Sequence, residues 1–336
     1  MSDEEQDEMD QISTVALLID DLSSEDPNAK LHSIQRLKSI AALLGPDRTT
    51  EELVPMLTEL IDKIDCNPEL MISLAEQLGN LTEILETSEN AAGLLDPLEI
   101  MVGNDDSQVR DKAIASIRKV AKMLNIDQIK TLYLPLLKRQ RKGDLFAMRI
   151  AACFLYADLY EKISDKDLRA MVRKKFTKLS KDDTPMVRRG AAQSVSIIVK
   201  DLESTHAKEF LLPIIKTLLE DSNDSVKIYA VQSSIDAAKV VDDSLMIRET
   251  ILPSFKSASE NRYSWRLRFA VAEQSALLGD YVSQTAVNDD ISSVYELLLR
   301  DSEPEVRSEA VAKIPSLAKY CSREVLADKI IPILME

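Results

Sequence analysis

The sequence of 336 residues is poor in the residue types on which sheets depend. It has only seven glycines, and aromatic residues make up 4% of the chain. Sheet-rich domains usually contain more aromatic and β-branched residues and more turn glycines. Leu, Ala, Ile, Lys, Glu and Asp dominate instead. The composition therefore favours an all-α protein.

Cysteine and histidine are also scarce. The three cysteines, Cys66, Cys153 and Cys321, are odd in number and far apart, which indicates reduced thiols rather than a disulfide framework. The two histidines, His32 and His206, offer little material for a zinc site or for activating a nucleophile. We expect no cofactor and no metal, and a cytoplasmic location with the nucleus as a second compartment.

Catalytic motifs and membrane signals are missing as well. The sequence has no P-loop, no G-x-G-x-x-G, no H-E-x-x-H and no C-x-x-C. Its apolar runs are far shorter than a membrane span. The first ten residues, MSDEEQDEMD, hold six acids and no base, unlike a signal or transit peptide. We predict a disordered acidic tail over residues 1–12, followed by one structured region over residues 13–336.

The formal net charge of −15 disfavours binding to nucleic acid or to a membrane, and favours a partner with a basic surface. The basic cluster LKRQRKGD (137–144) could attract phosphate, but it adjoins an acidic turn and lacks interleaved aromatics, so a local charged surface is the simpler interpretation. Pairs of Asp and Glu could in principle act as general acid and base. On exposed helices they are more often solvated or paired with Lys and Arg.

The sequence repeats with a period near 39 residues, which is the signature of a repeat array. An apolar residue followed by a basic one opens a helical pattern six times, at spacings of 39, 39, 39, 41 and 39 residues. The basic residues are Arg110, Arg149, Arg188, Lys227, Arg268 and Arg307.

A second recurring feature lies upstream of these apolar-basic pairs. Prolines recur within apolar helical patterns, with Val172 and Ser292 taking the same position in two repeats. Because proline removes a hydrogen bond and bends a helix, a bent first helix is expected in each repeat. These prolines are Pro55, Pro97, Pro135, Pro213, Pro253 and Pro332.

Each repeat is thus predicted to be a bent helix A, an acidic turn and a helix B, and such pairs must stack to bury their apolar faces. The pattern resembles HEAT repeats, which implies a right-handed α-solenoid of about eight antiparallel helix pairs with a horseshoe-like shape. The segment DKIIPILME would begin the first helix of a ninth repeat. We therefore expect the sequence to be a fragment of a longer array.

In HEAT repeats, an Asp and an Arg are expected to bond between adjacent repeats and form a ladder. Asn104, Gly143 and Arg262 occupy the Asp position in three repeats, where the ladder should be interrupted. The predicted ladder residues are Asp182, Arg188, Asp221, Lys227, Asp301 and Arg307.

The turns between helices A and B carry a further pattern. Proline stands three residues before the ladder position in four repeats, as expected for the first turn of a helix. Phe146 and Trp265 take the same position in two others. Exposed aromatics there could fit a pocket of a partner, although Trp265 could instead fold over the neighbouring turn as a lid. Stacking would align the acidic turns into a negatively charged edge that attracts a basic partner.

Several stretches resemble a specific family, the scaffolding A subunit of protein phosphatase 2A, from about residue 15 onward. They include ALLIDDLSSED, LAEQLGN, QVRDKAIASIR, SKDDTPMVRRGAAQS and SWRLRFAVAEQ. The resemblance implies a scaffold without enzymatic activity that holds a regulatory B-type subunit on the turns of its N-terminal repeats. The catalytic subunit would bind C-terminal repeats, present only in an array nearly twice this length. Alternatives are another HEAT adaptor in transport or chromatin, and an enzyme with an unrecognised carboxylate site.

The same resemblance implies which residues contact the regulatory subunit. Leu145 stands where the family commonly has Trp, which could alter the choice of partner. The implied partner-binding residues are Asp105, Asp106, Leu145, Phe146, Asp183, Pro185, Met186, Arg189, Ser264 and Trp265.

Overall fold

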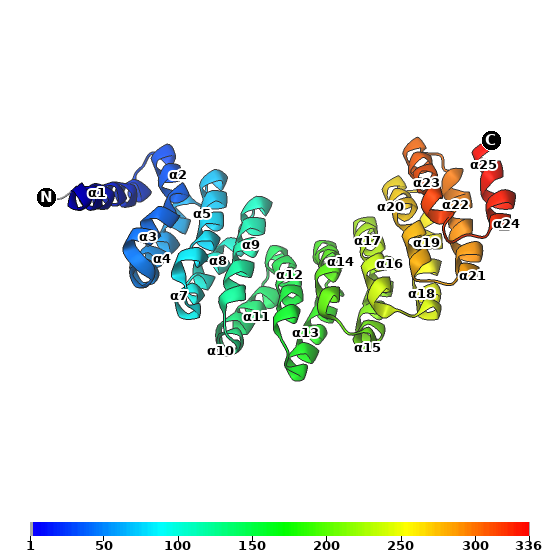
Figure 1. The fold of residues 1–336 in the computed structure, drawn as a ribbon, viewed down its shortest axis with the longest axis horizontal. Helices are drawn as coiled ribbons and strands as arrows, with labels where there is room; N and C mark the ends of the chain where they lie inside the picture. The colour runs from blue at the N-terminus through cyan, green and yellow to red at the C-terminus, as the bar shows by residue number, and fades with distance from the viewer. Residues whose placement is uncertain (1–2, 336) are drawn as a thin grey trace. The chain divides into compact units, whose positions relative to one another are not determined.

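The computed structural model describes the backbone of residues 3–335 and the side chains of residues 13–335, and every regular element in this part of the chain is a helix. The predicted all-α solenoid of helix pairs is confirmed. Helix α1 begins at Asp3, and the predicted disordered tail, residues 1–12, lies outside the residues whose side chains are described. The chain divides into two compact units, Met1–Leu155 and Tyr156–Glu336 (Figure 1).

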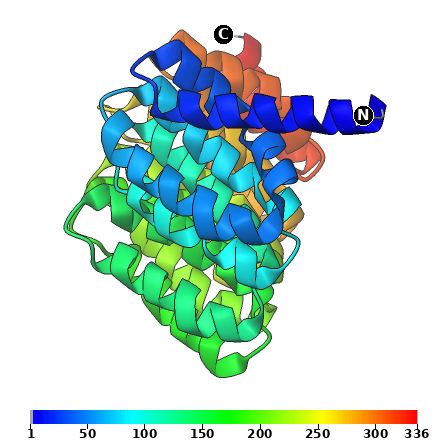
Figure 2. The ribbon, with the colours of Figure 1, turned by 90° about the vertical axis from the view of Figure 1, so that its left-hand side faces the viewer.

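The first unit holds the first three helix pairs and most of the fourth. Figure 2 views it end-on, with α1 nearest the viewer and the start of α1 extending past the helices behind it. Its elements are α1 (Asp3–Ser23), α2 (Pro27–Gln35), α3 (Leu37–Arg48), η1 (Thr49–Leu53), α4 (Val54–Ile64), α5 (Pro68–Asn80), α6 (Thr82–Leu85), α7 (Ser88–Ala92), α8 (Leu95–Val102), α9 (Ser107–Met123), α10 (Ile126–Gln128), η2 (Ile129–Tyr133), α11 (Leu134–Lys142) and the start of α12 (Phe146–Lys162).

The second unit holds the end of α12, four further pairs and the first helix of a ninth. Its remaining elements are α13 (Lys166–Leu179), α14 (Pro185–Ile198), η3 (Val199–Asp201), α15 (Ser204–His206), η4 (Ala207–Leu211), α16 (Leu212–Leu219), α17 (Asp224–Val241), α18 (Ser244–Thr250), α19 (Leu252–Ser259), α20 (Trp265–Gln274), η5 (Ser275–Asp280), α21 (Gln284–Ala286), η6 (Val287–Ile291), α22 (Ser292–Leu299), α23 (Pro304–Leu317), α24 (Arg323–Val325), η7 (Leu326–Ile330) and α25 (Ile331–Met335).

Most A helices are interrupted, and the interruptions follow the sequence. A single π-helical turn, η1, η2, η4 or η7, ends two residues before Pro55, Pro135, Pro213 or Pro332. The wider turn accommodates a ring that an ordinary helical turn would exclude. The same kind of turn, η6, also precedes Ser292, whose hydroxyl donates to the carbonyl of Asn288.

Val172 has neither a ring nor a polar side chain, and α13 around it is continuous. The interruption predicted from proline is therefore confirmed at the four prolines that follow a π-helical turn, and Ser292 shows that proline is not required for it.

The core lies between the paired helices. In α4, buried residues recur at the spacing of one helix face, as in Leu57, Leu60, Ile61 and Ile64. Each such side chain contributes about 1.5–3 kcal/mol when removed from water. Consecutive B helices also pack closely, as α5 does on α9 at Gly79, where an added Cβ would overlap the side chain of Ser116.

The A–B turns connect the end of each helix A to the start of the following helix B. No helix among the described residues has the length and apolar character needed to cross a bilayer.

Candidate functional site

The starts of several B helices are capped by side chains of the preceding A–B turn. Asp106 Oδ1 accepts hydrogen bonds from the backbone N–H groups of Gln108 and Val109, at 2.7 and 3.3 Å. Ser264 Oγ accepts from the N–H of Leu267 at 3.4 Å. These bonds satisfy free donors of the first helical turn. Asp106 and Ser264, predicted to contact a partner, therefore also cap α9 and α20.

The recurring arginine of helix B binds its own turn. Arg188 Nη1 donates to the carbonyls of Asp182 and Asp183, at 2.8 and 3.0 Å. Arg110 and Arg149 make the same two bonds in the first unit, and Arg307 makes them in the last turn. One guanidinium group thus fixes the backbone of each of these turns.

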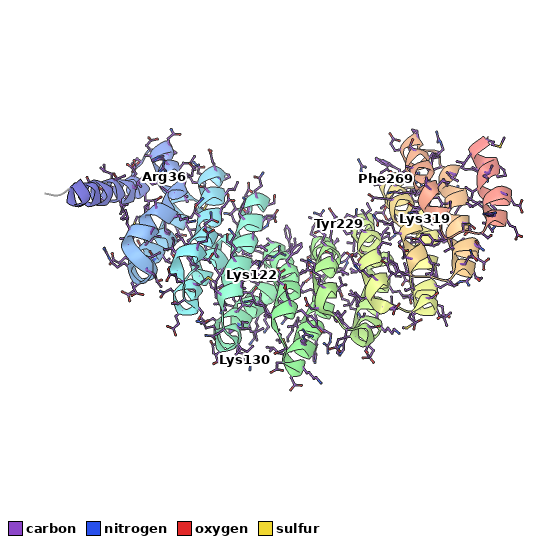
Figure 3. All side chains as sticks on the ribbon, in the orientation of Figure 1. Arg36, Lys122, Lys130, Tyr229, Phe269 and Lys319 are labelled. Carbon is purple, nitrogen blue, oxygen red and sulfur yellow. The ribbon has the colours of Figure 1, made fainter. Side chains whose placement is uncertain are left out.

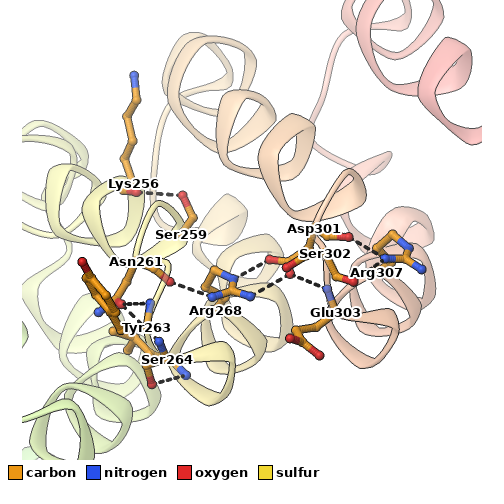
Figure 4. A network of polar contacts seen from close by, with 11 residues as sticks. Lys256, Ser259, Asn261, Tyr263, Ser264, Arg268, Asp301, Ser302, Glu303 and Arg307 are labelled. Atoms are coloured by element: carbon orange, nitrogen blue, oxygen red, sulfur yellow. Dashed lines mark hydrogen bonds and ion pairs between the residues drawn. The ribbon is translucent and has the colours of Figure 1, made fainter.

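Arg188 also reaches the next repeat, and so does Arg268 of the seventh turn. Arg188 donates through Nε and Nη2 to the two carboxylate oxygens of Asp221, at 2.5 and 2.9 Å. Arg268 binds Asp301 in the same way, at 2.5 and 2.8 Å, and both side chains are less than a tenth exposed (Figure 4). Forked, charge-assisted contacts of this kind are stronger than neutral hydrogen bonds and fix the geometry of both partners.

The pairing changes the acidity of the groups involved. Burial disfavours the charged carboxylate of Asp301, but hydrogen bonds from Arg268 and from the Glu303 N–H, with the nearby arginine charges, lower its pKa overall. The hydrogen bonds to Asp221 and Asp301 raise the pKa of Arg188 and Arg268. The Arg268–Asp301 pair is therefore ionised at neutral pH.

The connection between repeats 6 and 7 uses other groups. Lys227 pairs with Asp224 of its own turn at 3.5 Å, and the Asn261 amide donates to Asp224 at 3.4 Å. The sequence placed Arg262 in the Asp position of repeat 7, and this is wrong by one residue. Arg268 donates to the carbonyl of Asn261, and the Asn261 side chain accepts from the N–H groups that follow it, because this turn is one residue longer.

The predicted residues of the fifth turn lie together at the start of α14. Asp183 and Met186 are exposed, and Pro185, the first residue of α14, is half-buried. Arg189 stacks over the ring of Tyr229 from the next repeat, with its guanidinium carbon 5.4 Å from the ring centre. This contact keeps the Arg189 fork near the turn.

The seventh turn presents an aromatic and basic surface. Trp265 is half-buried and meets Phe269 edge-on, with ring centres 6.5 Å apart. The guanidinium carbon of Arg266 lies 4.6 Å from the Trp265 ring centre. Tyr263, at the tip of the turn, is 99% exposed. Cavities of about 630 Å³ each lie on both sides of this turn, and Arg262 lines both.

Tyr229 and Phe269 lie near the starts of α17 and α20 (Figure 3), two residues after Lys227 and one residue after Arg268 respectively. Sequence reasoning missed both aromatic residues. The repeat spacings of 39 and 41 lead from Arg189 to Ile228, the neighbour of Tyr229, and then to Phe269, so this signal could have found Phe269.

The first unit carries a cavity of about 1010 Å³ across its second, third and fourth A–B turns. Its lining includes six carboxylate residues and no Lys or Arg. These are Asp62, Asp65, Asp96, Glu99, Asp105 and Asp106.

The apolar part of this cavity is formed in part by Ile100 and Leu145, whose side chains are 50% and 52% exposed. Glu99 pairs with Arg139, and Asp65 accepts from the amide of Asn104 at 2.8 Å. Three further carboxylates, Asp62, Asp96 and Asp105, are exposed and form no ion pair within the described part of the chain. We call this cavity the acidic groove.

The acidic groove brings together Asp105, Asp106 and Leu145 of the predicted residues, with Phe146, 46% exposed, directly after them. Sequence reasoning did not find Asp62, Asp96 or Ile100. They lie on helix A rather than in the turns, and only their position in the fold places them beside Asp105.

The chain is similar to several curated proteins, although no family model matches it. It is 32% identical over 276 residues to the PP2A regulatory protein of the A type from Schizosaccharomyces pombe, covering 82% of this chain and 46% of that protein. It is 38% identical to the protein phosphatase 2A scaffold subunit of Dictyostelium discoideum, over 62% of this chain and 35% of the relative. The beta isoform of the human 65 kDa regulatory protein of phosphatase 2A is 40% identical over 58% of this chain and 32% of its own length.

The chain thus spans about half the length, or less, of these relatives. The resemblance to the scaffolding A subunit that the sequence indicated is confirmed.

Solved structures show the fold alone. Kap121p carrying D353K/E396K/D438K superposes on 98% of this chain with a TM-score of 0.79, at 12% identity and over 35% of its own chain. Kap121p bound to RanGTP covers the whole of this chain with a TM-score of 0.76, at 13% identity and over 36% of its own chain.

Proposed function

Starting from the similarity to the scaffolding proteins of phosphatase 2A, we propose that this chain is a non-catalytic scaffold. It docks a regulatory B-type subunit of a serine/threonine phosphatase 2A holoenzyme on its A–B turns. The relatives are named as regulatory or scaffold subunits, which supports a role in assembly rather than in chemistry.

The observation that carries the proposal is the acidic groove. A cavity with exposed Ile100 and Leu145 and a rim of carboxylates is complementary to a protein segment that carries an apolar side chain between Lys or Arg residues. Contact would remove the two apolar side chains from water and would give Asp62, Asp96 and Asp105 cationic partners.

The second unit offers further contacts. Met186 and Asp183 are exposed on the fifth turn, and Trp265 carries Arg266 against its ring on the seventh. Trp and Arg are the residue types most enriched among interface anchors. We propose the ten partner-binding residues named above as contacts for the regulatory subunit.

The catalytic subunit is proposed to need repeats beyond those of this chain, since the chain spans less than half of its relatives. We propose a cytoplasmic and nuclear location for the assembly. A transport or chromatin adaptor is the alternative, but it rests on structural neighbours of 12–14% identity, which share the fold only.

The proposal is tested with the double variant Ile100→Glu/Leu145→Glu. Two carboxylates in place of these side chains remove the apolar surface of the groove and must be desolvated beside the apolar side chain of the segment, so we expect the affinity for purified regulatory subunits to fall by about 30-fold or more. The matched control is Ile126→Glu/Leu132→Glu, which changes two residues of the same unit that are 43% exposed and lie outside the groove. The control should bind within about twofold of the unaltered chain.

Binding is measured by interferometry on the immobilised full chain, with circular dichroism as the folding check. Unchanged affinity of the groove variant would remove the acidic groove from the interface. Recovery of transport or chromatin proteins from extract, without any phosphatase regulatory subunit, would contradict the proposed function itself.

A further inference from the structure

Helix α13 in the second unit reverses the charge of the rest of the chain. Residues 166–181 hold seven basic residues and one acid, whereas the whole chain has a net charge of −15. Four of the seven, Lys166, Lys174, Lys178 and Lys181, are exposed. Lys166, Lys174 and Lys178 lie on α13 at spacings of eight and four residues, which places them along one face, and Lys181 follows in the turn after the helix. We call these four residues the lysine stripe.

The stripe is not neutralised by the protein. No ion pair joins any of its four lysines to a carboxylate within the described residues. Lys174 and Lys178 stand four residues apart, an arrangement in which like charges destabilise a helix. The helix therefore keeps a repulsion that a bound anion would relieve.

Other A helices of the same unit use their cations differently. Lys208 pairs with Asp243 at 3.1 Å, and Arg248 pairs with Asp289 and Asp290 at 3.1 and 2.7 Å, each across to the next repeat. Paired cations of this kind tie repeats together. The lysine stripe departs from that pattern, which points to a ligand outside the chain.

The two arginines of α13, Arg169 and Arg173, form contacts within the chain. Arg169 lies 4.8 Å over the ring of Tyr160 and donates to the carbonyl of Ile163, and Arg173 donates to the Tyr160 hydroxyl at 2.7 Å. The forked donors that best suit phosphate are thus occupied, and the ammonium groups, which act as point charges, remain.

We infer that the lysine stripe binds a short carboxylate-rich segment of a partner protein. From Lys166 to Lys178 the stripe extends about 18 Å, which matches some six extended residues. A long polyanion such as duplex DNA would reach past the stripe onto an acidic surface, whereas a segment of this length stays within it. The stripe lies on helix A of the fifth repeat and reaches the fifth A–B turn only at Lys181, whereas the proposed docking of a regulatory subunit uses the turns themselves.

The test uses a fluorescein-labelled octaglutamate peptide, the full chain and fluorescence anisotropy at about 50 mM salt, where surface charges are weakly screened. The variant Lys174→Glu/Lys178→Glu should weaken binding by about tenfold or more. Its matched control, Lys256→Glu/Lys319→Glu, has the same net charge and alters two exposed lysines of the same unit, and it should stay within about twofold.

Equal losses in both variants, or no binding by the unaltered chain, would overturn the inference. So would tighter binding of a 20-base-pair duplex or of phosphatidylserine vesicles with the same dependence on Lys174 and Lys178, because the ligand would then be phosphate. If the Glu variant fails to fold, Lys174→Gln/Lys178→Gln replaces it, with an expected loss of about threefold.

Discussion

The side-chain contacts that link consecutive A–B turns differ between the two units. In the second unit, Arg188 and Arg268 each hold the carboxylate of the next repeat in a buried, two-point contact. In the first unit, Arg110 binds carbonyls of its own turn, and Gly143 stands where the next repeat would supply a carboxylate. Between the second and third turns, the side-chain amide of Asn104 donates a hydrogen bond to Asp65.

A carboxylate in an A–B turn therefore has one of two roles. Where an arginine of the neighbouring repeat reaches it, as at Asp221, the carboxylate is buried and links the two repeats. Where none does, as at Asp105, it stays exposed and lines the acidic groove. The turns of the array can therefore serve either stability or recognition.

The largest loss of stability is expected when a buried ion pair of the second unit is broken. Arg268→Ala leaves Asp301 buried without its partner, and we expect a loss of about 3–5 kcal/mol in the free energy of unfolding. Arg110→Ala removes bonds to two carbonyls and should cost about 1–2 kcal/mol. Urea unfolding followed by circular dichroism measures both.

A double variant, Arg268→Leu/Asp301→Leu, distinguishes the stabilisation by the ion pair from the cost of leaving Asp301 buried without a partner. Removing both partners should recover most of the stability lost in Arg268→Ala, because no buried charge remains unpaired. If Arg268→Ala costs no more than Arg110→Ala, the buried pair does not distinguish the two units.

The pH dependence of stability should differ in the same way. The pKa of Asp301 is lowered in the folded chain, so its contribution is complete above the ordinary value of about 3.9 and is lost as the pH falls through the folded value. Between pH 7 and pH 3, the unaltered chain should therefore lose more stability than Arg268→Leu/Asp301→Leu. Equal losses would show that Asp301 contributes nothing to acid unfolding.

Most of the array could be predicted from the sequence because its determinants are local and repeated. The arginine at the start of helix B and the proline within helix A each recur at nearly fixed spacing, so one correct assignment fixes the others. The exposed residues Leu145 and Met186 were predicted instead from the resemblance to the scaffolding A subunit.

The remaining features depend on single insertions or on contacts between repeats. One additional residue in the seventh turn moved the Asp position of the repeat from Arg262 to Asn261, which spacing alone does not reveal. The acidic groove needs Asp62 and Ile100, which lie on different A helices, to meet Leu145. Such a meeting is set by packing and leaves no mark in either segment by itself.

The seventh turn carries the aromatic residue Trp265. Trp265→Ala should weaken the binding of a regulatory subunit by roughly 30-fold, because a large aromatic anchor is lost. The edge contact with Phe269 is part of the same surface, so helicity and unfolding should change little. Interferometry and a urea titration decide between the two interpretations of this residue. If stability falls sharply and affinity does not, Trp265 is a lid over the neighbouring turn.

The smallest effect is expected at Asp183, the exposed neighbour of Asp182 in the fifth turn. Asp183→Lys should weaken regulatory-subunit binding about fivefold at low salt, and less as salt rises, because a rim charge acts through a screened field. Glu249→Lys makes the same change of charge on helix α18, away from the A–B turns of the same unit, and should change affinity less than twofold. Since both variants alter the net charge equally, only their difference reports on the turn. Equal losses would mean that the partner senses the total charge of the chain rather than the fifth turn.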